Sequence, residues 1–431
     1  MQALIDATLL GNYQRQILLL LGLAVLMDGF DVQAIGFVAP AIIQQWGVNK
    51  ASLGPVFGAG LFGMLVGSLM LSVLADRVGR RPVLIGATIF FAACMLLTPQ
   101  VTTLGELRMI RFVTGIGLGA IMPNARALAG EFSPRRARVT LMMLVSCGFT
   151  VGAVLGGMLS AALIPSRGWE SVFYVGGAVP LVAGIAMWIA LPESMHFRVT
   201  HGVGVDVVAR TLSRIDGVPR TAPHPVYLTT ERTLPVAPVS ALFHDGRTRQ
   251  TLLLWAVNFL NLINLYFLSN WLPTIATASG LSTSRALLLG TTLQLGGVVG
   301  TIVLGGVIDR AGFRRVLVLS FMAASLAIAL IGAPSLPLAL LFVVVGITGF
   351  CIVGGPPAVN ALAAEFYPTP LRSTGLGESL GVGRIGSIIG PVLGGALIAL
   401  RWSNRSLFLA VASPALLSAL CVLLMPRDRA A

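Results

Sequence analysis

Charged residues are scarce in this sequence. Aspartate, glutamate, lysine and arginine together make up 10% of the 431 residues, whereas about a quarter of a typical soluble chain is charged. Hydrophobic residues make up 56%, and they form successive apolar blocks of roughly 20 residues, the length that crosses a bilayer. This composition excludes an ordinary soluble protein. It predicts an all-α polytopic membrane protein, because a helix satisfies its own backbone hydrogen bonds in lipid.

Cysteine and histidine are also rare, with four residues of each. All four cysteines lie in apolar blocks without disulfide or metal-ligand spacing, and the histidines all fall between residues 196 and 244. The glycine-rich run at 115–119 has no preceding strand, so it predicts close helix packing and not a nucleotide loop. We therefore expect no metal, no cofactor and no enzyme activity.

Twelve transmembrane helices are predicted, in two halves of six. A polar segment rich in proline, arginine and histidine separates the halves, which predicts an N-terminal bundle at 1–191, a linker loop at 192–249 and a C-terminal bundle at 250–431. The spans fall at about 17–41, 52–74, 82–98, 104–129, 139–163, 170–191, 250–272, 285–308, 314–333, 337–361, 372–400 and 404–425.

Positive charge is distributed unevenly between the two sides of this topology. Of the 29 lysine and arginine residues, 20 fall on the side of both termini and the linker, and five fall on the other side. The positive-inside rule then predicts cytoplasmic termini and a cytoplasmic linker. The net charge of +13 is explained by topology, so we expect no nucleic-acid partner.

An internal repeat relates the two halves. The segment "LADRVGRRPVL" at 74–84 returns as "VIDRAGFRRVL" at 307–317, and "PNARALAGEFSPRRAR" at 123–138 returns as "PAVNALAAEFYPTPLR" at 357–372. The first pair is offset by 233 residues and the second by 234, and Gly152 and Gly156 match Gly386 and Gly390 at an offset of 234. Several motifs at one offset predict duplicated six-helix units with pseudo-twofold symmetry.

With these motifs the chain resembles the major facilitator superfamily. The loop "GSLMLSVLADRVGRRP" matches that superfamily's G-x-x-x-D-R-x-G-R-R pattern from Asp76 onward, with Ser72 at the place of a usual glycine. The resemblance implies a carrier that works by alternating access and not a channel.

Acids and arginines recur together in the repeated loops, where they can make charge-assisted hydrogen bonds to neighbouring helix ends. We expect them to gate the conformational change by holding the cytoplasmic side closed, although simple topology is an alternative explanation. The residues are Asp76, Arg77, Arg80, Arg81, Glu131 and Arg138, with Asp309, Arg310, Arg314, Glu365 and Arg372 in the second copy.

Two acids lie inside the first span. Asp28 and Asp31 are three residues apart, so they share one helix face, and charge at this depth is costly unless it is paired or functional. Two neighbouring buried acids disfavour joint ionisation, so one of them can exchange a proton near neutral pH. We predict that this pair carries proton coupling; structural pairing with arginines is the alternative. In the second half Asn261 and Asn264 match these positions without charge.

Arginines within the spans are candidates to bind an anion. Arg111 and Arg384 lie at membrane depth, where each could neutralise an acid or grip a carboxylate with two hydrogen bonds; Arg126 could extend to the membrane surface. Further substrate-binding candidates are polar or aromatic side chains of the spans: Asn124, Gln33, Asn261, Asn264, Tyr266 and Trp271. Packing is the alternative role for the aromatic residues.

The stretch "DGFDVQAIGFVAPAI" is similar to the signature of the aromatic acid:proton symporters, a bacterial branch of the superfamily. The stretches "RFVTGIGLGAIMPNARALAGEFSP", "LPES", "YFLSNWLPTI" and "GRIGSIIGPVLGG" are similar as well. This resemblance implies import of a benzoate-type or hydroxybenzoate-type acid with protons. It also implies that Arg111 is needed for transport.

The competing hypothesis is a proton antiporter that exports drugs. Such exporters usually have a Gly-Pro pair in span five, whereas span five here reads "GAVLGG" and the pair occurs in span eleven. We therefore expect a symporter with two partners besides the lipid bilayer, a small aromatic acid and protons. We also expect it to work as a monomer in the bacterial inner membrane.

Overall fold

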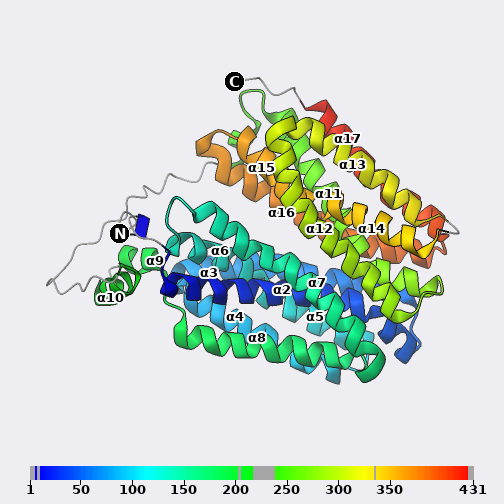
Figure 1. The fold of residues 1–431 in the computed structure, drawn as a ribbon, viewed down its shortest axis with the longest axis horizontal. Coiled ribbons are helices and arrows are strands. Elements are labelled where there is room, and N and C mark those ends of the chain that lie inside the picture. Colours follow the sequence, from blue (N-terminus) through cyan, green and yellow to red (C-terminus); the bar gives the residue numbers. More distant parts are fainter. Residues whose placement is uncertain (1–4, 7–9, 202–204, 217–237, 334–335, 426–431) are drawn as a thin grey trace. The chain divides into compact units, whose positions relative to one another are not determined.

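The computed structural model describes residues 5–6, 10–201, 205–216, 238–333 and 336–425, and within them it contains helices and no strands. Figure 1 shows their order. The first half forms α2 (Asn12–Trp46), α3 (Gly54–Val78), α4 (Arg80–Leu97), α5 (Leu104–Gly119), α6 (Ile121–Phe132), α7 (Arg138–Arg167) and α8 (Glu170–Ala190). The second half forms α11 (Thr248–Ala278), α12 (Thr283–Ala311), α13 (Phe313–Ile331), α14 (Leu338–Ile352), α15 (Gly355–Phe366), α16 (Thr369–Ala399) and α17 (Asn404–Leu424).

These helices confirm the predicted class. Eleven helices in the described part of the chain are long and apolar enough to cross a membrane. The predicted fourth span is not among these eleven, and it is divided into α5 and α6. Several helices extend past the predicted ends, as α2 does at both of its ends.

The linker segment contains structure that the sequence did not predict. Two short helices, α9 (Met195–Thr200) and α10 (Val205–Asp216), follow α8, and a 3₁₀ turn at Val239–Phe243 precedes α11. Val208 and Leu212 of α10 are buried, while Asp206 and Arg210 are exposed, so α10 is an amphipathic helix packed onto the protein. Residues 217–237 of the predicted linker lie outside the described residues.

The fourth and tenth spans are both broken, and at matching positions. Helix α5 gives way to α6 at Ala120, and α14 gives way to α15 at Val353–Gly354. The first residues of α6 and α15, Ile121 and Gly355, are 234 residues apart, and so are their last residues, Phe132 and Phe366. Such a break places backbone polar groups inside the membrane, which is tolerated where the protein surrounds them. The repeat therefore extends to an irregular feature of the backbone.

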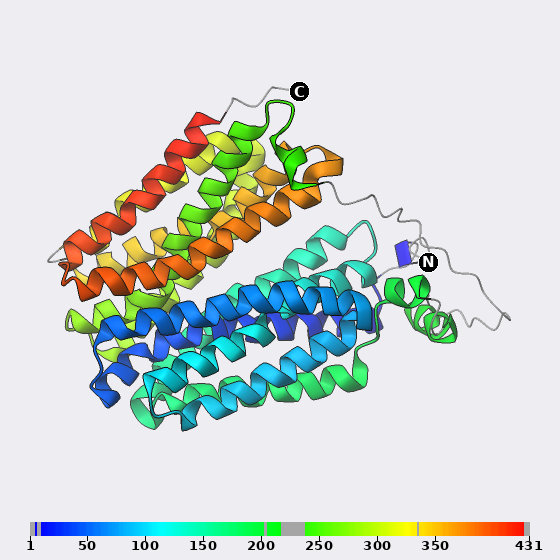
Figure 2. The same ribbon diagram turned by 180° about the vertical axis from the view of Figure 1, so that it is seen from behind.

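Glycine contacts repeat in the same way. A Cβ added to Gly152 of α7 would lie 1.8 Å from the carbonyl oxygen of Leu26 in α2, and one added to Gly386 of α16 would lie 2.3 Å from that of Phe259 in α11. The two contacts are related by the repeat offset of 233 to 234 residues. Only a residue without a side chain lets the two backbones approach this closely. Figure 2 shows α11 and α16 side by side.

The chain forms two compact units that do not follow the sequence halves. One comprises Met1–Val32, Phe62–Gly152 and Phe173–Thr233, and the other comprises Gln33–Leu61, Ala153–Val172 and Leu234–Ala431. The second unit thus includes the C-terminal part of α2 and the N-terminal part of α3. The division of the chain at residues 191 and 249 stays a prediction.

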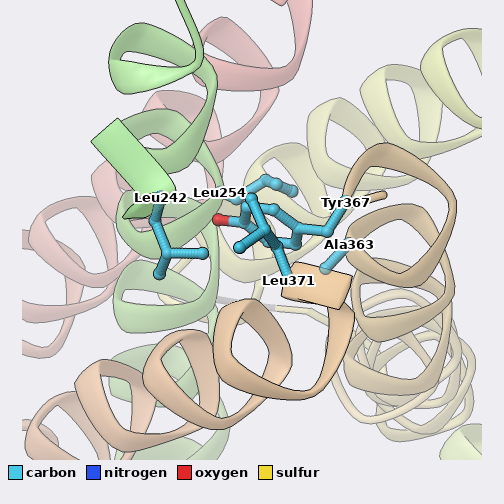
Figure 3. Close-up of a cluster of buried hydrophobic side chains, with 5 residues drawn as sticks. All are labelled: Leu242, Leu254, Ala363, Tyr367 and Leu371. Carbon is cyan, nitrogen blue, oxygen red and sulfur yellow. The ribbon is translucent and has the colours of Figure 1, made fainter. Parts of the chain in front are cut away.

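One end of the second-half helices is held by a buried cluster, drawn in Figure 3. Side chains from α11, α15, α16 and the 3₁₀ turn converge there, namely Leu242, Leu254, Ala363, Tyr367 and Leu371. The hydroxyl group of Tyr367 donates a hydrogen bond of 3.2 Å to Thr251 Oγ1. The cluster fixes the turn between α15 and α16 against the start of α11.

Candidate transport site

The two acids of the first span lie near the middle of α2. Asp28 is 1% exposed and Asp31 is 0% exposed, so neither charge is hydrated. Helix α2 is 35 residues long, and the residues before Asp28 and after Asp31 are mostly apolar, so the helix spans the membrane although it contains two acids. Their spacing of three residues places them on one face of the helix, as the sequence predicted.

Arg111 binds Asp31. Its Nη1 donates to Asp31 Oδ1 at 2.8 Å, and its Nη2 donates to Asp31 Oδ2 at 3.0 Å. The side chains of Arg111 and Asp31 are 3% and 0% exposed. Helix α5 presents Arg111 from its second turn, and a capping box of Thr103 and Glu106 fixes the start of that helix. A bidentate, charge-assisted pair of this kind is strong and directional.

The pairing makes the two acids unequal. The guanidinium of Arg111 neutralises the charge of Asp31 and satisfies both of its carboxylate oxygens. Nη2 also approaches the backbone carbonyl of Asp31 at 3.4 Å, so the cation is committed to this one residue. Sequence reasoning left open whether Arg111 pairs with an acid or holds a substrate. The structure shows it paired with Asp31.

Arg384 has a different environment. It lies at the middle of α16, a helix of 31 residues, and its side chain is partly buried. Its guanidinium forms no hydrogen bond or ion pair with any residue that the structure describes, whereas its carbonyl accepts a hydrogen bond from Ser387 Oγ at 2.6 Å. Arg384 therefore stays a candidate to bind an anion, as the sequence predicted.

The place of Arg384 on its helix supports this interpretation. Ile388 and Val392 follow Arg384 by one and two turns in α16, and both contact α3 at Gly58. A Cβ added to Gly58 would lie 2.7 Å from Val392 Cγ2 and 3.7 Å from the carbonyl oxygen of Ile388. Because helical neighbours recur every three to four residues, Arg384 is the next residue of this stripe. It lies one turn before Ile388, just outside the contact between α16 and α3.

Three asparagines of α11 are spaced three residues apart and are fully or almost fully buried. Asn258 Nδ2 donates to Ser379 Oγ of α16 at 2.6 Å. The amide of Asn264, oriented with its nitrogen toward α17, donates to the Val411 carbonyl at 2.7 Å and accepts from Ala415 N at 3.0 Å. Asn261, between them, has no hydrogen-bond partner for either amide atom among the described residues. Thus Asn264 ties two helices together, although the sequence suggested it as a substrate ligand.

The remaining substrate-binding candidates are mostly engaged. Asn124 Nδ2 donates to the carbonyl of Ala120 at 2.8 Å, across the break between α5 and α6. Trp271 is fully buried, donates to the Pro391 carbonyl at 2.9 Å and packs edge-on against Phe57. Gln33 is 1% exposed, with an oxygen that no described residue bonds.

Two candidates are less enclosed. Tyr266 is partly buried, and its carbonyl accepts a hydrogen bond from Asn270 at 2.8 Å. Arg126, which the sequence placed toward the membrane surface, donates a hydrogen bond of 2.8 Å to Ser146 Oγ.

A charged cluster forms at the start of α4, and we call it the Glu131–Glu193 cluster. Arg80 forms an ion pair with Glu131, whose two carboxylate oxygens also accept from Ser194 Oγ at 2.9 and 2.7 Å. Glu193 Oε1 accepts from the backbone N–H groups of Arg80 and Arg81, each at 3.0 Å. The carboxylate thereby caps α4, which begins after Gly79 at a φ of 104°. These bonds hold Arg80 and Glu131 next to the start of α4.

Sequence reasoning missed the part of Glu193 and Ser194 in this cluster. The signal was the "LPES" stretch after α8, which the sequence offered only as a family likeness. The other first-copy residues are outside the cluster: Asp76 and Arg77 are exposed, and Arg138 is partly buried at the start of α7. The guanidinium of Arg81 donates to the carbonyl of Trp188.

The second copy forms no matching cluster among the described residues. Asp309, Arg310, Glu365 and Arg372 are exposed. Arg314 donates to the Leu423 carbonyl of α17 at 2.6 Å. The sequence repeat is therefore not a repeat of the charge network.

Comparison with known proteins identifies the family. Residues 21–287 and 254–431 match the profile of the Major Facilitator Superfamily. This chain belongs to the Major Facilitator Superfamily. Its fold agrees with that of a D-xylose–proton symporter, with a TM-score of 0.72 at 16% identity over 95% of this chain and 97% of the other. The predicted fold of twelve transmembrane helices in two six-helix halves is confirmed.

Two curated members of the superfamily are similar over almost the whole chain. The 4-hydroxybenzoate transporter PcaK of Pseudomonas aeruginosa is 38% identical, over 98% of this chain and 95% of its own length. The gallate transporter of Pseudomonas putida is 39% identical, over 97% of this chain and 93% of its own length. The predicted resemblance to the aromatic acid branch of the superfamily is confirmed, and so is the prediction of a membrane transporter.

Proposed function

We propose that this protein imports a small aromatic carboxylate together with a proton. Its relatives are named for 4-hydroxybenzoate and gallate, both aromatic acids. The observation that carries the proposal is the unequal state of Arg111 and Arg384. Arg111 is bound to Asp31, whereas Arg384 has no acidic partner among the described residues. A carrier of an anion needs one free cation, and Arg384 supplies it.

Proton transfer is assigned to Asp28. Two carboxylates three residues apart in a buried helix are costly if both are charged. Since both carboxylate oxygens of Asp31 accept hydrogen bonds from Arg111, the proposal assigns the proton to Asp28. Release of that proton requires access to water on one side of the membrane, which alternating access provides.

Charge balance couples the two ligands. An empty carrier has a charged Asp28 and a charged Arg384 within its spans, and a charge at that depth costs roughly 2.5–3.5 kcal/mol on insertion scales. A proton neutralises Asp28, and the substrate carboxylate neutralises Arg384. Binding of one ligand alone changes the net charge of the spans by one unit, whereas binding of both leaves it unchanged, so changing conformation with both ligands bound is favoured over changing with one.

The loop residues are assigned to conformational gating. Asp76 and Asp309 are exposed, so they are free to bind helix ends in another state of the transport cycle. The Glu131–Glu193 cluster keeps the start of α4 rigid while this happens. With the distribution of arginine, the proposal places both termini in the cytoplasm, in a bacterial inner membrane. One chain holds all the residues invoked, so a monomer is sufficient.

The test is uptake of radiolabelled 4-hydroxybenzoate into proteoliposomes. A pH gradient of one unit, alkaline inside, supports about tenfold accumulation for one proton per anion. Asp28→Asn should abolish accumulation driven by the gradient and retain exchange of labelled for unlabelled acid. Arg384→Met should abolish both. Asp206→Asn, which changes an exposed acid of α10, is the matched control and should behave as the wild type. Gradient-driven accumulation by Asp28→Asn would falsify the assignment of the proton.

A further inference from the structure

The amide of Asn261 is buried without a partner. Its side chain is 0% exposed, and neither its nitrogen nor its oxygen is hydrogen bonded to a described residue. Asn258 and Asn264, one turn before and after it on α11, are both satisfied. A buried amide without hydrogen bonds is destabilising, and such groups are rare in native proteins.

The amide points at the start of the broken helix α15. A Cβ added to Gly355, the first residue of α15, would lie 3.2 Å from Asn261 Nδ2 and 3.8 Å from its Oδ1, and no atom outside this side chain would be nearer. Pro356 and Pro357 follow Gly355. Proline has no N–H group, so neither residue can donate a backbone hydrogen bond to Asn261 Oδ1. A ligand reaches the amide only if this first turn of α15 moves away from it.

The chemistry of this site selects a neutral group. An amide offers one kind of donor and one acceptor side by side. A carboxylate only accepts, so it would leave Oδ1 facing a second negative oxygen, and the prolines remove N–H donors that a helix start would otherwise offer an anion. A hydroxyl group both donates and accepts, so it can satisfy Nδ2 and Oδ1 together.

We infer that Asn261 binds a ring hydroxyl group of the transported acid and thereby selects hydroxylated over unsubstituted benzoates. This inference rests on the proposed function, in which Arg384 holds the carboxylate. Asn261 and Arg384 lie at a similar level of two adjacent helices. A Cβ on Gly383 would lie 2.9 Å from Leu262 Cδ1 and 3.6 Å from the carbonyl oxygen of Asn258, so the residue before Arg384 is next to the turn of α11 that contains Asn261.

The first measurement uses the wild-type protein and a panel of competitors. Uptake of radiolabelled 4-hydroxybenzoate is measured against benzoate, the three monohydroxybenzoates and 4-methoxybenzoate. At least one monohydroxybenzoate should compete about tenfold to hundredfold better than benzoate, the ratio expected for one buried hydroxyl with both hydrogen bonds made. Methoxybenzoate can accept but not donate, so it should compete less well than 4-hydroxybenzoate. If benzoate competes as well as every hydroxylated acid, the inference is wrong, although import of aromatic acids still stands.

The second measurement uses Asn261→Leu, which keeps the volume of the side chain and removes both polar atoms. Competition by hydroxylated acids should weaken about tenfold or more, competition by benzoate should be unchanged, and the midpoint of thermal unfolding without substrate should rise. Asn258→Leu is the matched control, because it breaks a bond between helices and should weaken all acids equally. An equal loss for all acids in Asn261→Leu, with a lower midpoint, would show a structural role. Failure of the wild type to take up any aromatic acid would overturn the proposed function itself.

Discussion

Replacing Arg111 by methionine removes both hydrogen bonds that the carboxylate of Asp31 accepts, at 2.8 and 3.0 Å. The carboxylate then stays at 0% exposure without a cation. Replacing Asp31 by leucine leaves the guanidinium of Arg111 equally isolated. Either change should destabilise the protein strongly, because a buried charge is left uncompensated.

The structure gives the size of this effect. Breaking a fully buried ion pair from one side costs about 3–5 kcal/mol, whereas replacing both partners by apolar residues of similar volume is about neutral or slightly stabilising. We expect each single variant to lose about 3–5 kcal/mol and the double variant Asp31→Leu/Arg111→Met to recover most of it. The coupling energy of the double-mutant cycle should then be at least about 3 kcal/mol.

Two assays are needed, because stability and transport should separate. Thermal unfolding of the four detergent-solubilised proteins, followed by size-exclusion chromatography with fluorescence detection, should show low midpoints for both single variants and a near wild-type midpoint for the double variant. Gradient-driven uptake of labelled 4-hydroxybenzoate should be lost in all three variants, including the stable double variant, because each of them changes the charges next to Asp28, the residue assigned to the proton.

Two results would contradict this reasoning. A double variant less stable than either single variant would mean that the two residues contribute independently and not as a pair. A double variant that accumulates substrate as the wild type does would mean that the pair only holds the helices together.

Three further outcomes are expected from other contacts. Glu193→Gln should lower stability by about 1–3 kcal/mol, since a charged acceptor of helix N–H groups is lost, and the thermal midpoint measures this. Gly152→Val should prevent accumulation of folded protein, because its Cβ would lie 1.8 Å from the Leu26 carbonyl oxygen, whereas Gly305→Ala, with nothing within 4 Å, should be neutral in the same expression assay. Tyr367→Phe should cost about 1 kcal/mol at neutral pH. Burial raises the pKa of Tyr367 above its ordinary value of 10.0, so the wild type should lose stability relative to this variant as the pH rises above about 10. Unfolding titrations of both proteins at neutral pH and above about pH 10 measure this difference.

Local patterns were sufficient to predict the class of the fold. Hydropathy is a property of each segment, so the spans could be placed from the sequence, and the repeated motifs were enough to pair the halves. The acids at Asp28 and Asp31 could be recognised because charge in a span is rare. Helix ends were less accurate, because α2 and other helices continue into polar residues beyond the bilayer length.

Long-range partners could not be predicted. Nothing within α2 distinguishes Asp31 from Asp28; the distinction comes from Arg111, which lies 80 residues away in α5. Asn264 has a side chain of a type that often binds ligands, but its amide is hydrogen bonded to the backbone of α17. Pro123 in the first turn of α6 matches Pro357 in the first turn of α15, but a proline at a helix start is common, so the break at Ala120 was recognised only in the backbone.

The location of the Glu131–Glu193 cluster has a consequence for synthesis of the chain. Every residue of the cluster precedes α9 in the sequence, so its bonds can form before the ribosome has made the rest of the linker after Ser194, and domains generally fold as units from the N-terminus. By contrast, the far ends of the first-half helices contact late partners: a Cβ on Gly36 would lie 2.7 Å from the carbonyl oxygen of Ser269. The contacts at the first turn of α4 can therefore form early in translation. The contacts at the other ends of the first-half helices form only after the second half has been inserted.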